Sequence, residues 1–543
     1  MHKSISFFLV ILLPLFSAAQ HHMATEKQVL KSVKQGTTEV LADYLTHGGD
    51  ADATLDGQKK TLLSYAVKYQ NLKAVKLLLD NGADVNLVSD GKTPLMFAIQ
   101  NKNYRIMNLL LHADADIETE INNKNTALIY AVKQRCLLCA QMLVGNGATV
   151  QYRNGKGMSA LDYANLTNNV PMAEYLVRVI EMQNYYKNLS AYFDGPHMQW
   201  LSDNLLRVFY MKYDTTLHNF LIDERFVDVN SDTTIVHGFA GDTTNYTITR
   251  HIATEPTHFD NVDKIMAFGD LHGHYSALIK FMQHHSVIDD KLQWSWESGH
   301  VVILGDVFDR GNEVTETLWF IYQLDQQARR KGGRVHLLLG NHEVMVMHND
   351  TRYLNRKYEL FSNYFMRDYS GLYDSTSVLG RWLLSRNTVI TINDLLFSHA
   401  GISPAVLQKE ISLAKINSLV LEYLNTDLNQ PSKEAALMNL LLNENGPLWY
   451  RGYMLDGVIG ELIGQKEVDK ILAFYNVDKI IIAHTEVQQL TSMYDGKVIA
   501  IDVPIRTSGI IPEALLIEDR GFYRLSIEGK TLCGKEYGKK QEN

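Results

Sequence analysis

Six residues able to bind a divalent metal ion each follow a short apolar run that predicts a β-strand. They are Asp270, His272, Asp306, Asn341, His399 and His484. The first four lie in the motifs GDLHG, GDVFDRG and GNHE, which recur at regular intervals. The glycine in each motif allows the backbone to turn sharply, so the next residue projects from the end of its strand. A set of carboxylate, imidazole and carboxamide groups in this arrangement predicts a metal site.

The elements around the three motifs form two consecutive βαβ units. Residues 301–304 and 335–339 are rich in Val, Leu and Ile, as expected for strands buried on both faces. The stretches 275–284 and 314–331 have the pattern of crossover helices. Further strands are predicted at 393–397, 479–483, 498–502 and 522–527. Because open α/β sheets bind ligands at the carboxyl ends of their strands, we expect the motif residues to gather at one edge of the sheet.

The types of ligand indicate which metal ions the site would bind. Carboxylate, imidazole and carboxamide groups together suit a pair of borderline divalent ions such as Mn, Fe or Zn. The absence of thiolate ligands argues against a structural zinc site. One carboxylate shared by two ions holds them about 3.5–4 Å apart, the spacing that two-metal hydrolases use. Asp306, on the middle strand of the three, is the natural bridge, and manganese is the metal expected to support activity in vitro.

The motifs resemble those of the calcineurin-like metallophosphoesterases, and specifically those of the PPP-type protein phosphatases. GDLHG, GDVFDRG, GNHE and HAGISP occur in the family's order, and the resemblance covers about residues 262–506. The extended segment GNHEVMVMHND and the motif GPLWYR resemble the bacterial Shewanella-like branch. The resemblance implies an α/β fold, in which a metallophosphatase β-sandwich is flanked by helices.

Carried over position by position, the resemblance implies two groups of metal ligands that share one residue. One ion would be bound by Asp270, His272 and Asp306. The other ion would be bound by Asp306, Asn341, His399 and His484.

Four further residues receive roles from the same resemblance. Arg310 and Arg451 would bind the substrate phosphate, whose oxygens suit a planar, two-pronged donor. His342 would be the general acid, and Asp309 would orient it. Two cations would lower the pKa of a bridging water, so that hydroxide attacks phosphorus in line. Proton donation by His342 to the leaving oxygen would contribute about 10²–10⁴-fold.

The predicted function is therefore that of an exported phosphomonoesterase, with a phosphoprotein on Ser/Thr or Tyr as the expected substrate. A phosphodiesterase or a dinucleoside-polyphosphate hydrolase is an alternative within the same fold. A non-catalytic protein that acts only through its N-terminal repeats is an alternative from another class. The complete set of metal-binding and acid residues argues against this last alternative.

A repeat precedes the predicted catalytic region. TLLSYAV, TPLMFAI, TALIYAV and SALDYAN begin at Thr61, Thr93, Thr126 and Ser159 and recur with a period of about 33 residues. They resemble the ankyrin repeat, whose TPLHxA signature they nearly reproduce. About five such units would stack into an all-α solenoid, because no repeat buries its apolar face alone. The array could bind a protein partner or serve as a spacer.

The remaining sequence divides the 543 residues into further parts. Lys3, the apolar run 5–16 and the small residues 17–19 form a secretory signal, which predicts a periplasmic or secreted protein. Short strands are predicted at 198–200, 206–210, 234–236 and 246–249. We predict a signal peptide at 1–19, an ankyrin-repeat domain at 24–183, a β-rich connecting region at 184–261, a metallophosphatase domain at 262–530 and a C-terminal tail at 531–543.

Composition excludes some classes of function. A formal net charge of −9 argues against a general nucleic-acid-binding surface. No stretch after the signal is long and apolar enough to predict a transmembrane helix. Three cysteines do not make a disulfide framework. Cys136 and Cys139 lie in an apolar helical pattern, where we expect them to be small buried side chains.

Overall fold

The computed structural model describes residues 24–54, 60–185, 192–214, 219–365, 368–425, 434–454, 462–505 and 512–533. The predicted signal peptide lies outside these ranges. Within them, no helix combines the length and the apolar character that crossing a bilayer requires. The chain divides into two compact units, of which the first ends at Asn169 and the second comprises 144–150 and the residues from Val170 onward.

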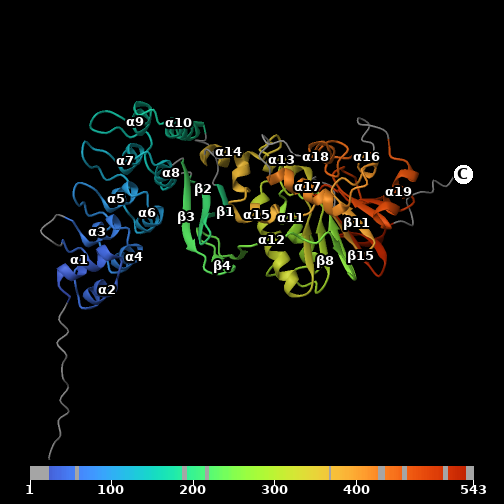
Figure 1. The fold of residues 1–543 in the computed structure, drawn as a ribbon, viewed down its shortest axis with the longest axis horizontal. Helices are drawn as coiled ribbons and strands as arrows, with labels where there is room; N and C mark the ends of the chain where they lie inside the picture. The colour runs from blue at the N-terminus through green and yellow to red at the C-terminus, as the bar shows by residue number, and fades with distance from the viewer. Residues whose placement is uncertain are drawn as a thin grey trace, which may run out of the picture. The chain divides into compact units, whose positions relative to one another are not determined.

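The first unit consists of helix pairs that stack in chain order (Figure 1). Its helices are α1 (Glu26–Gln35), α2 (Glu39–Thr46), α3 (Leu62–Lys68), α4 (Leu72–Asp80), α5 (Pro94–Gln100), α6 (Tyr104–His112), α7 (Ala127–Lys133), α8 (Leu137–Gly145) and α9 (Ala160–Leu166). The repeated threonine starts the first helix of a pair, because Thr61 and Thr93 each accept a hydrogen bond from a backbone N–H in the first turn. Asn71 and Asn103 cap the second helices in the same way. These paired helices confirm the predicted repeat fold.

The two cysteines of the first unit differ from expectation. Cys136 and Cys139 are buried, as predicted, but a disulfide bond joins their sulfur atoms. Cys136 stands just before α8 and Cys139 lies in its first turn, so their Cα atoms are 5.2 Å apart, a distance that a disulfide spans. The interpretation of the pair as simple buried side chains was therefore wrong.

Two six-stranded sheets form the centre of the second unit. The first, ordered β17-β16-β15-β7-β8-β9, comprises β7 (Lys264–Phe268), β8 (His300–Ile303), β9 (Arg334–Leu337), β15 (Glu513–Glu518), β16 (Gly521–Ser526) and β17 (Gly529–Leu532). The second, ordered β13-β14-β12-β11-β10-β6, comprises β6 (His258–Phe259), β10 (Val389–Ile392), β11 (Leu395–Ser398), β12 (Lys479–Ile482), β13 (Thr491–Met493) and β14 (Val498–Ala500). Val302 and Leu515 of one sheet share a core with Ile390 and Ile481 of the other. This is the predicted β-sandwich.

The predicted βαβ units are present in the first sheet. β7, β8 and β9 are parallel neighbours, joined by α11 (Tyr275–His284) and α12 (Val314–Arg330) (Figure 1). The three motifs therefore leave the sheet at one edge. The other helices of this unit are α10 (Val170–Tyr185), α13 (Asn341–Met347), α14 (Arg356–Phe365), α15 (Val378–Leu383), α16 (Pro404–Leu407), α17 (Leu413–Asn425), α18 (Ala435–Leu442) and α19 (Gln465–Tyr475), with a 3₁₀ turn η1 (Tyr369–Leu372).

A β-rich region precedes the sandwich in the same unit. It contains the antiparallel sheet of β1 (Tyr192–Ser202), β2 (Leu205–Asp214) and β3 (Asn219–Asp228), and the pair β4 (Thr233–His237) and β5 (Asn245–Thr249). Asp194 of β1 is fully buried. It forms an ion pair with Lys357 Nζ at 2.8 Å and accepts a hydrogen bond from His197 Nε2 at 2.8 Å. Lys357 belongs to α14, so a buried ion pair joins this region to the sandwich.

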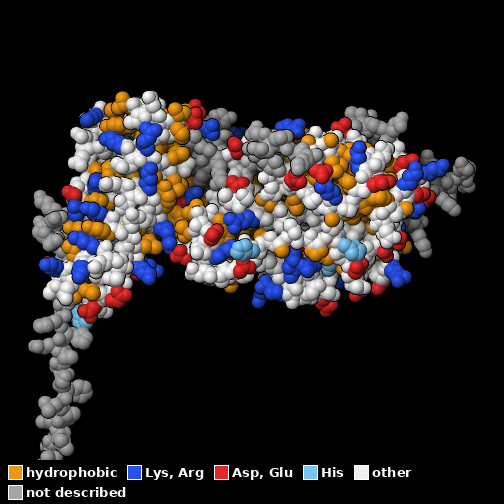
Figure 2. Space-filling view, viewed as in Figure 1, with side chains coloured by type: hydrophobic (Ala, Val, Ile, Leu, Met, Phe, Trp, Pro, Cys, Tyr) orange, Lys and Arg blue, Asp and Glu red, His pale blue; other side chains and the backbone are white. Residues whose placement is uncertain are grey.

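The surface of the molecule carries charges of both signs. On the face drawn in Figure 2, Lys and Arg side chains are interspersed with Asp and Glu. Among the described residues on that face, the basic side chains form no extended stripe of the kind that follows a nucleic-acid backbone.

Candidate active site

The backbone turns where the strands end, and these turns place the candidate ligands. His272, Asp306 and His484 have φ values of 44°, 51° and 67°, in the left-handed region that side chains other than glycine rarely adopt. Such strain costs about 1–3 kcal/mol for each residue and is typical of functional sites. Gly340 is required by close packing, because a Cβ there would lie 2.2 Å from Asp306 Oδ1.

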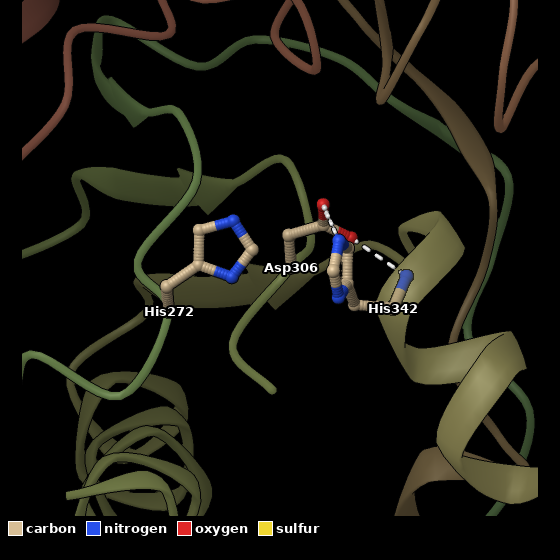
Figure 3. A group of neighbouring side chains, drawn as sticks. All are labelled: His272, Asp306 and His342. Carbon is tan, nitrogen blue, oxygen red and sulfur yellow. Dashed lines mark hydrogen bonds and ion pairs between the residues drawn. The ribbon is translucent and has the colours of Figure 1, made fainter. Parts of the chain in front are cut away.

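Asp306 lies at the centre of the site. Figure 3 shows His272 and His342 on either side of its carboxylate. The backbone N–H of His342 donates to Asp306 Oδ1 at 2.9 Å, which fixes the orientation of the carboxylate. His399 Nε2 lies 3.4 Å from Asp306 Oδ2. The Asp306 carboxylate thus lies close to the side chains of His272, His342 and His399.

Glu343 holds the loops that carry these groups. Its fully buried carboxylate accepts hydrogen bonds from the backbone N–H groups of Asp306 at 2.8 Å, Val307 at 2.7 Å and Gly340 at 2.7 Å. The glutamate of GNHE therefore joins the ends of β8 and β9. Glu343 was given no role from the sequence, although its place in the motif was a usable signal.

Backbone carbonyls orient two of the histidines. His272 Nδ1 lies 2.8 Å from the Phe308 carbonyl oxygen, and His399 Nδ1 lies 2.8 Å from that of Leu304. Since the Nδ1–H of His272 donates to a carbonyl, its Nε2 is left with a lone pair that faces the site. Burial lowers the pKa of His272 to about 3, which keeps this ring in the neutral form that binds metal.

The donor set fits two metal ions. Among the described residues, His272, Asp306 and His342 form one group whose ligand atoms lie within 4.8 Å of one another, and Asp306, His399 and His484 form another. Asp306 belongs to both. Nε2 of His484 is buried without a hydrogen-bond partner, and burial lowers the pKa of this imidazole well below its usual value. A buried, neutral and unpartnered imidazole nitrogen suits a metal ligand.

The other two predicted ligands lie in the same place. Asp270 is buried, with one oxygen 3.8 Å from His272 Nε2 and the other 3.8 Å from His399 Nδ1. Asn341 Oδ1 lies 2.8 Å from His399 Nε2. The structure therefore brings together all six predicted ligands.

His342 differs from the other histidines in what holds its ring. Nδ1 lies 2.5 Å from an oxygen of Asp309, whose side chain is fully buried. Burial lowers the pKa of His342, but the negative charges of Asp306 and Asp309 outweigh this and raise it overall. A protonated imidazole oriented by a carboxylate is suited to donate a proton from Nε2. These features favour proton donation over metal binding for His342, although its ring also lies within reach of a metal position.

The two predicted arginines line one cavity of about 270 Å³, together with the metal-binding groups. Arg310 Nη1 lies 3.4 Å from Glu486 Oε1, and Arg451 Nη1 donates to the hydroxyl of Thr485 at 3.3 Å. One loop therefore contacts both arginines. Glu486 was given no role from the sequence, because its position opposite Arg310 arises only from the tertiary fold.

Aromatic side chains complete the wall of this cavity. Tyr353 and Trp449 both line it. The Tyr353 ring centroid lies 5.3 Å from that of His342, and the Trp449 ring lies 5.8 Å from that of His484. Neither aromatic residue was predicted as part of the site.

The fold and site are those of a calcineurin-like phosphoesterase, and the model of that family matches residues 263–488. The crystal structure of a cold-active protein-tyrosine phosphatase from a psychrophilic Shewanella species is similar, with 34% sequence identity and a TM-score of 0.56. The match covers 63% of this chain and 99% of that one. Shewanella-like protein phosphatase 1 of Plasmodium berghei (strain Anka) is 27% identical over 291 residues, which cover 51% of this chain and 78% of that protein. The chain belongs to the calcineurin-like phosphoesterases, in the branch of the Shewanella-like protein phosphatases.

The same comparisons confirm the class of enzyme and the repeat domain. Shewanella-like protein phosphatase 2 of Arabidopsis thaliana is 37% identical over 101 residues, which cover 19% of this chain and 26% of that protein. Ankyrin-repeat models match residues 29–121 and 118–177. The chain is therefore a metallophosphatase that carries N-terminal ankyrin repeats.

Proposed function

We propose that the protein is an exported, two-metal phosphomonoesterase that acts on phosphoproteins. The observation that carries this proposal is the position of Asp306, which belongs to two groups of metal-binding side chains and faces the same cavity as two arginines. Two metal ions that share one carboxylate, placed opposite two planar guanidinium groups, suit a terminal phosphate group.

Different residues would bind each of the two metal ions. Asp270 and His272 would bind one ion, Asn341, His399 and His484 would bind the other, and Asp306 would bind both. When bound, the ions supply a nucleophilic water for in-line attack and neutralise charge on the phosphoryl oxygens. Manganese, iron and zinc all suit these donors, and we expect manganese to support activity in vitro.

Arg310 and Arg451 would bind the phosphate from the solvent side of the cavity. Each presents a guanidinium group whose geometry matches two phosphate oxygens. A terminal phosphate leaves enough oxygens free for both arginines and both metal positions. A diester carries a second substituent where one of these contacts would form, so the arrangement favours monoesters.

His342 would protonate the leaving oxygen. Nδ1–H donates to Asp309, which leaves Nε2–H available to the substrate. This contribution is worth about 10²–10⁴-fold in typical enzymes, and more for poor leaving groups than for good ones.

A phosphorylated side chain in a protein is the substrate that we propose. The similar Shewanella enzyme is a protein-tyrosine phosphatase. In this chain, Tyr353 and Trp449 line the cavity that holds the arginines, and Tyr353 is 46% exposed. An aromatic wall favours a phosphotyrosine ring over the small side chain of phosphoserine. Export rests on the sequence of residues 1–19, and the repeats are the proposed site for a protein partner.

A panel of phosphate esters tests the proposed reaction. The mature protein with added manganese is assayed on p-nitrophenyl phosphate, its bis ester, a phosphotyrosine peptide and a phosphoserine peptide. We expect the fastest turnover on the phosphotyrosine peptide, and loss of turnover on chelation. Preference for the bis ester would instead identify a phosphodiesterase, and two bound metal ions without turnover would point to the repeats as the functional part.

Two arginine variants provide a matched control for the phosphate contacts. Arg310 and Arg352 both lie near the Tyr353 ring. The distance from the guanidinium carbon to the ring centroid is 5.9 Å for Arg310 and 5.8 Å for Arg352. Arg352 is paired with Asp350 at 2.7 Å and does not line the cavity. Arg310→Ala should raise KM for p-nitrophenyl phosphate, whereas Arg352→Ala should leave it unchanged. Equal effects of the two changes would remove Arg310 from the phosphate site.

A further inference from the structure

Asp502 is a buried acid that the proposed mechanism does not use. Its residue is 1% exposed, and neither carboxylate oxygen has a hydrogen-bond partner. It follows β14, which pairs in parallel with β12, the strand that leads to His484. Asp502 thus leaves the second sheet at the same edge as a predicted metal ligand.

The backbone of Asp502 lies directly against the turn that carries Asp270. A Cβ added to Gly269 would lie 2.7 Å from the Asp502 Cα atom, so these two chain segments touch where β7 and β14 end. The carbonyl oxygen of Asp502 also accepts a hydrogen bond from Val487 N at 2.8 Å, which ties it to the loop after His484. Asp502 is thereby held between two segments that carry metal ligands.

The charges around Asp502 are mostly of its own sign. Asp270, Asp306 and Glu486 all interact with it electrostatically, and His399 is the basic group among its main interactions. Burying several carboxylates together is costly unless cations compensate them. Bound divalent ions would provide that compensation.

We propose that Asp502 is an additional acidic residue of the metal centre, which strengthens metal binding through its charge and its contact with the Asp270 turn. This inference rests on the proposed two-metal function. Asp502 is a positioning residue in this account, since the groups of mutually close metal-binding atoms do not include it. Residues that support metal ligands in this way typically change metal affinity by about 10–100-fold.

Asp502→Asn should have opposite effects on the metal-free and the metal-bound protein. Without metal, the substitution removes repulsion among buried carboxylates, so the melting temperature of the chelated protein should rise. With metal, it removes attraction for the cations, so the manganese dissociation constant should rise about tenfold or more. A merely structural aspartate would not show this reversal, because its loss would destabilise both forms.

The experiment compares wild type, Asp502→Asn and Asp194→Asn by calorimetric manganese titration, metal analysis and thermal unfolding with and without chelator. Asp194 is the control, because it is equally buried but is paired with Lys357 outside the metal site. Its substitution should lower the melting temperature of both forms and leave manganese affinity unchanged.

The outcomes separate this inference from the proposed function. An unchanged manganese affinity in Asp502→Asn, or a chelated variant that is less stable than wild type or fails to fold, would overturn the role of Asp502 alone. Failure of the wild-type chain to bind two metal ions would contradict the proposed function, and the inference would fail with it.

Discussion

The hydrogen bond between Asp309 and His342 offers a sharp test of proton transfer. Asp309→Asn replaces a carboxylate that lies 2.5 Å from His342 Nδ1 by a neutral group of the same shape. A hydrogen bond to a charged group contributes about 1.5–3 kcal/mol, and each 1.36 kcal/mol corresponds to a factor of ten in rate. We therefore expect kcat to fall about 10–100-fold for substrates with a poor leaving group.

The leaving group distinguishes proton transfer from general damage to the site. An alkyl phosphate or phosphoserine peptide needs a proton on its departing oxygen, whereas p-nitrophenolate departs without one. Asp309→Asn and His342→Asn should therefore slow the first kind of substrate strongly and p-nitrophenyl phosphate weakly. His342→Asn should cost about 10²–10⁴-fold on poor leaving groups, since it removes the acid altogether.

The pH profile should change in a defined direction. Burial lowers the pKa of His342, while Asp306 and then Asp309 raise it, so that the sum is a raised pKa. Activity requires the protonated ring and falls as the pH rises through that pKa. Loss of the Asp309 charge lowers the pKa, so the alkaline limb should move to lower pH. Equal loss on all leaving groups, or loss of bound metal in Asp309→Asn, would refute the reasoning.

Three further predictions follow from the charges of the second unit. Glu486→Gln removes the partly exposed ion pair in which Glu486 Oε1 lies 3.4 Å from Arg310 Nη1. The inhibition constant for inorganic phosphate should therefore fall by about two- to fivefold. A higher inhibition constant would count against the pairing. Asp306→Asn should abolish metal binding, and unchanged metal content by mass spectrometry would remove its bridging role. Lys357→Met leaves buried Asp194 without its lysine, which should cost about 3–5 kcal/mol in urea unfolding at neutral pH. Burial opposes ionisation of Asp194, but Lys357 and His197 lower its pKa from 3.8 to about 2. Wild type should therefore lose this stabilisation as the pH falls from 4 to 2. The Lys357→Met variant should show no such loss.

The sequence predicted the elements whose pattern is local. α11 was placed at its observed bounds, because the motif before it and the apolar spacing within it are contiguous in sequence. Strand β3 was missed because Glu224 and other charged residues interrupt its apolar pattern. Glu224 is nevertheless buried and accepts a hydrogen bond from Arg207 Nε of β2 at 2.7 Å, a compensation that only the folded sheet provides.

The site was predicted only in part, because only some of its residues belong to a local sequence pattern. Residues inside the motifs could be assigned, since the motif and the strand end stand together in the sequence. Glu486, Tyr353 and Asp502 lie outside the recognised motifs, so their side chains could be placed at the site only from the fold. Their placement depends on how the second sheet and the insertions pack against the first.

The two-metal site is the central claim, and a metal titration of turnover tests it most directly. Metal-free protein receives manganese in steps, with bound metal counted per chain and phosphotyrosine-peptide hydrolysis measured at each step. We predict that turnover saturates when two ions are bound per chain. Full turnover with one ion or none would contradict the account.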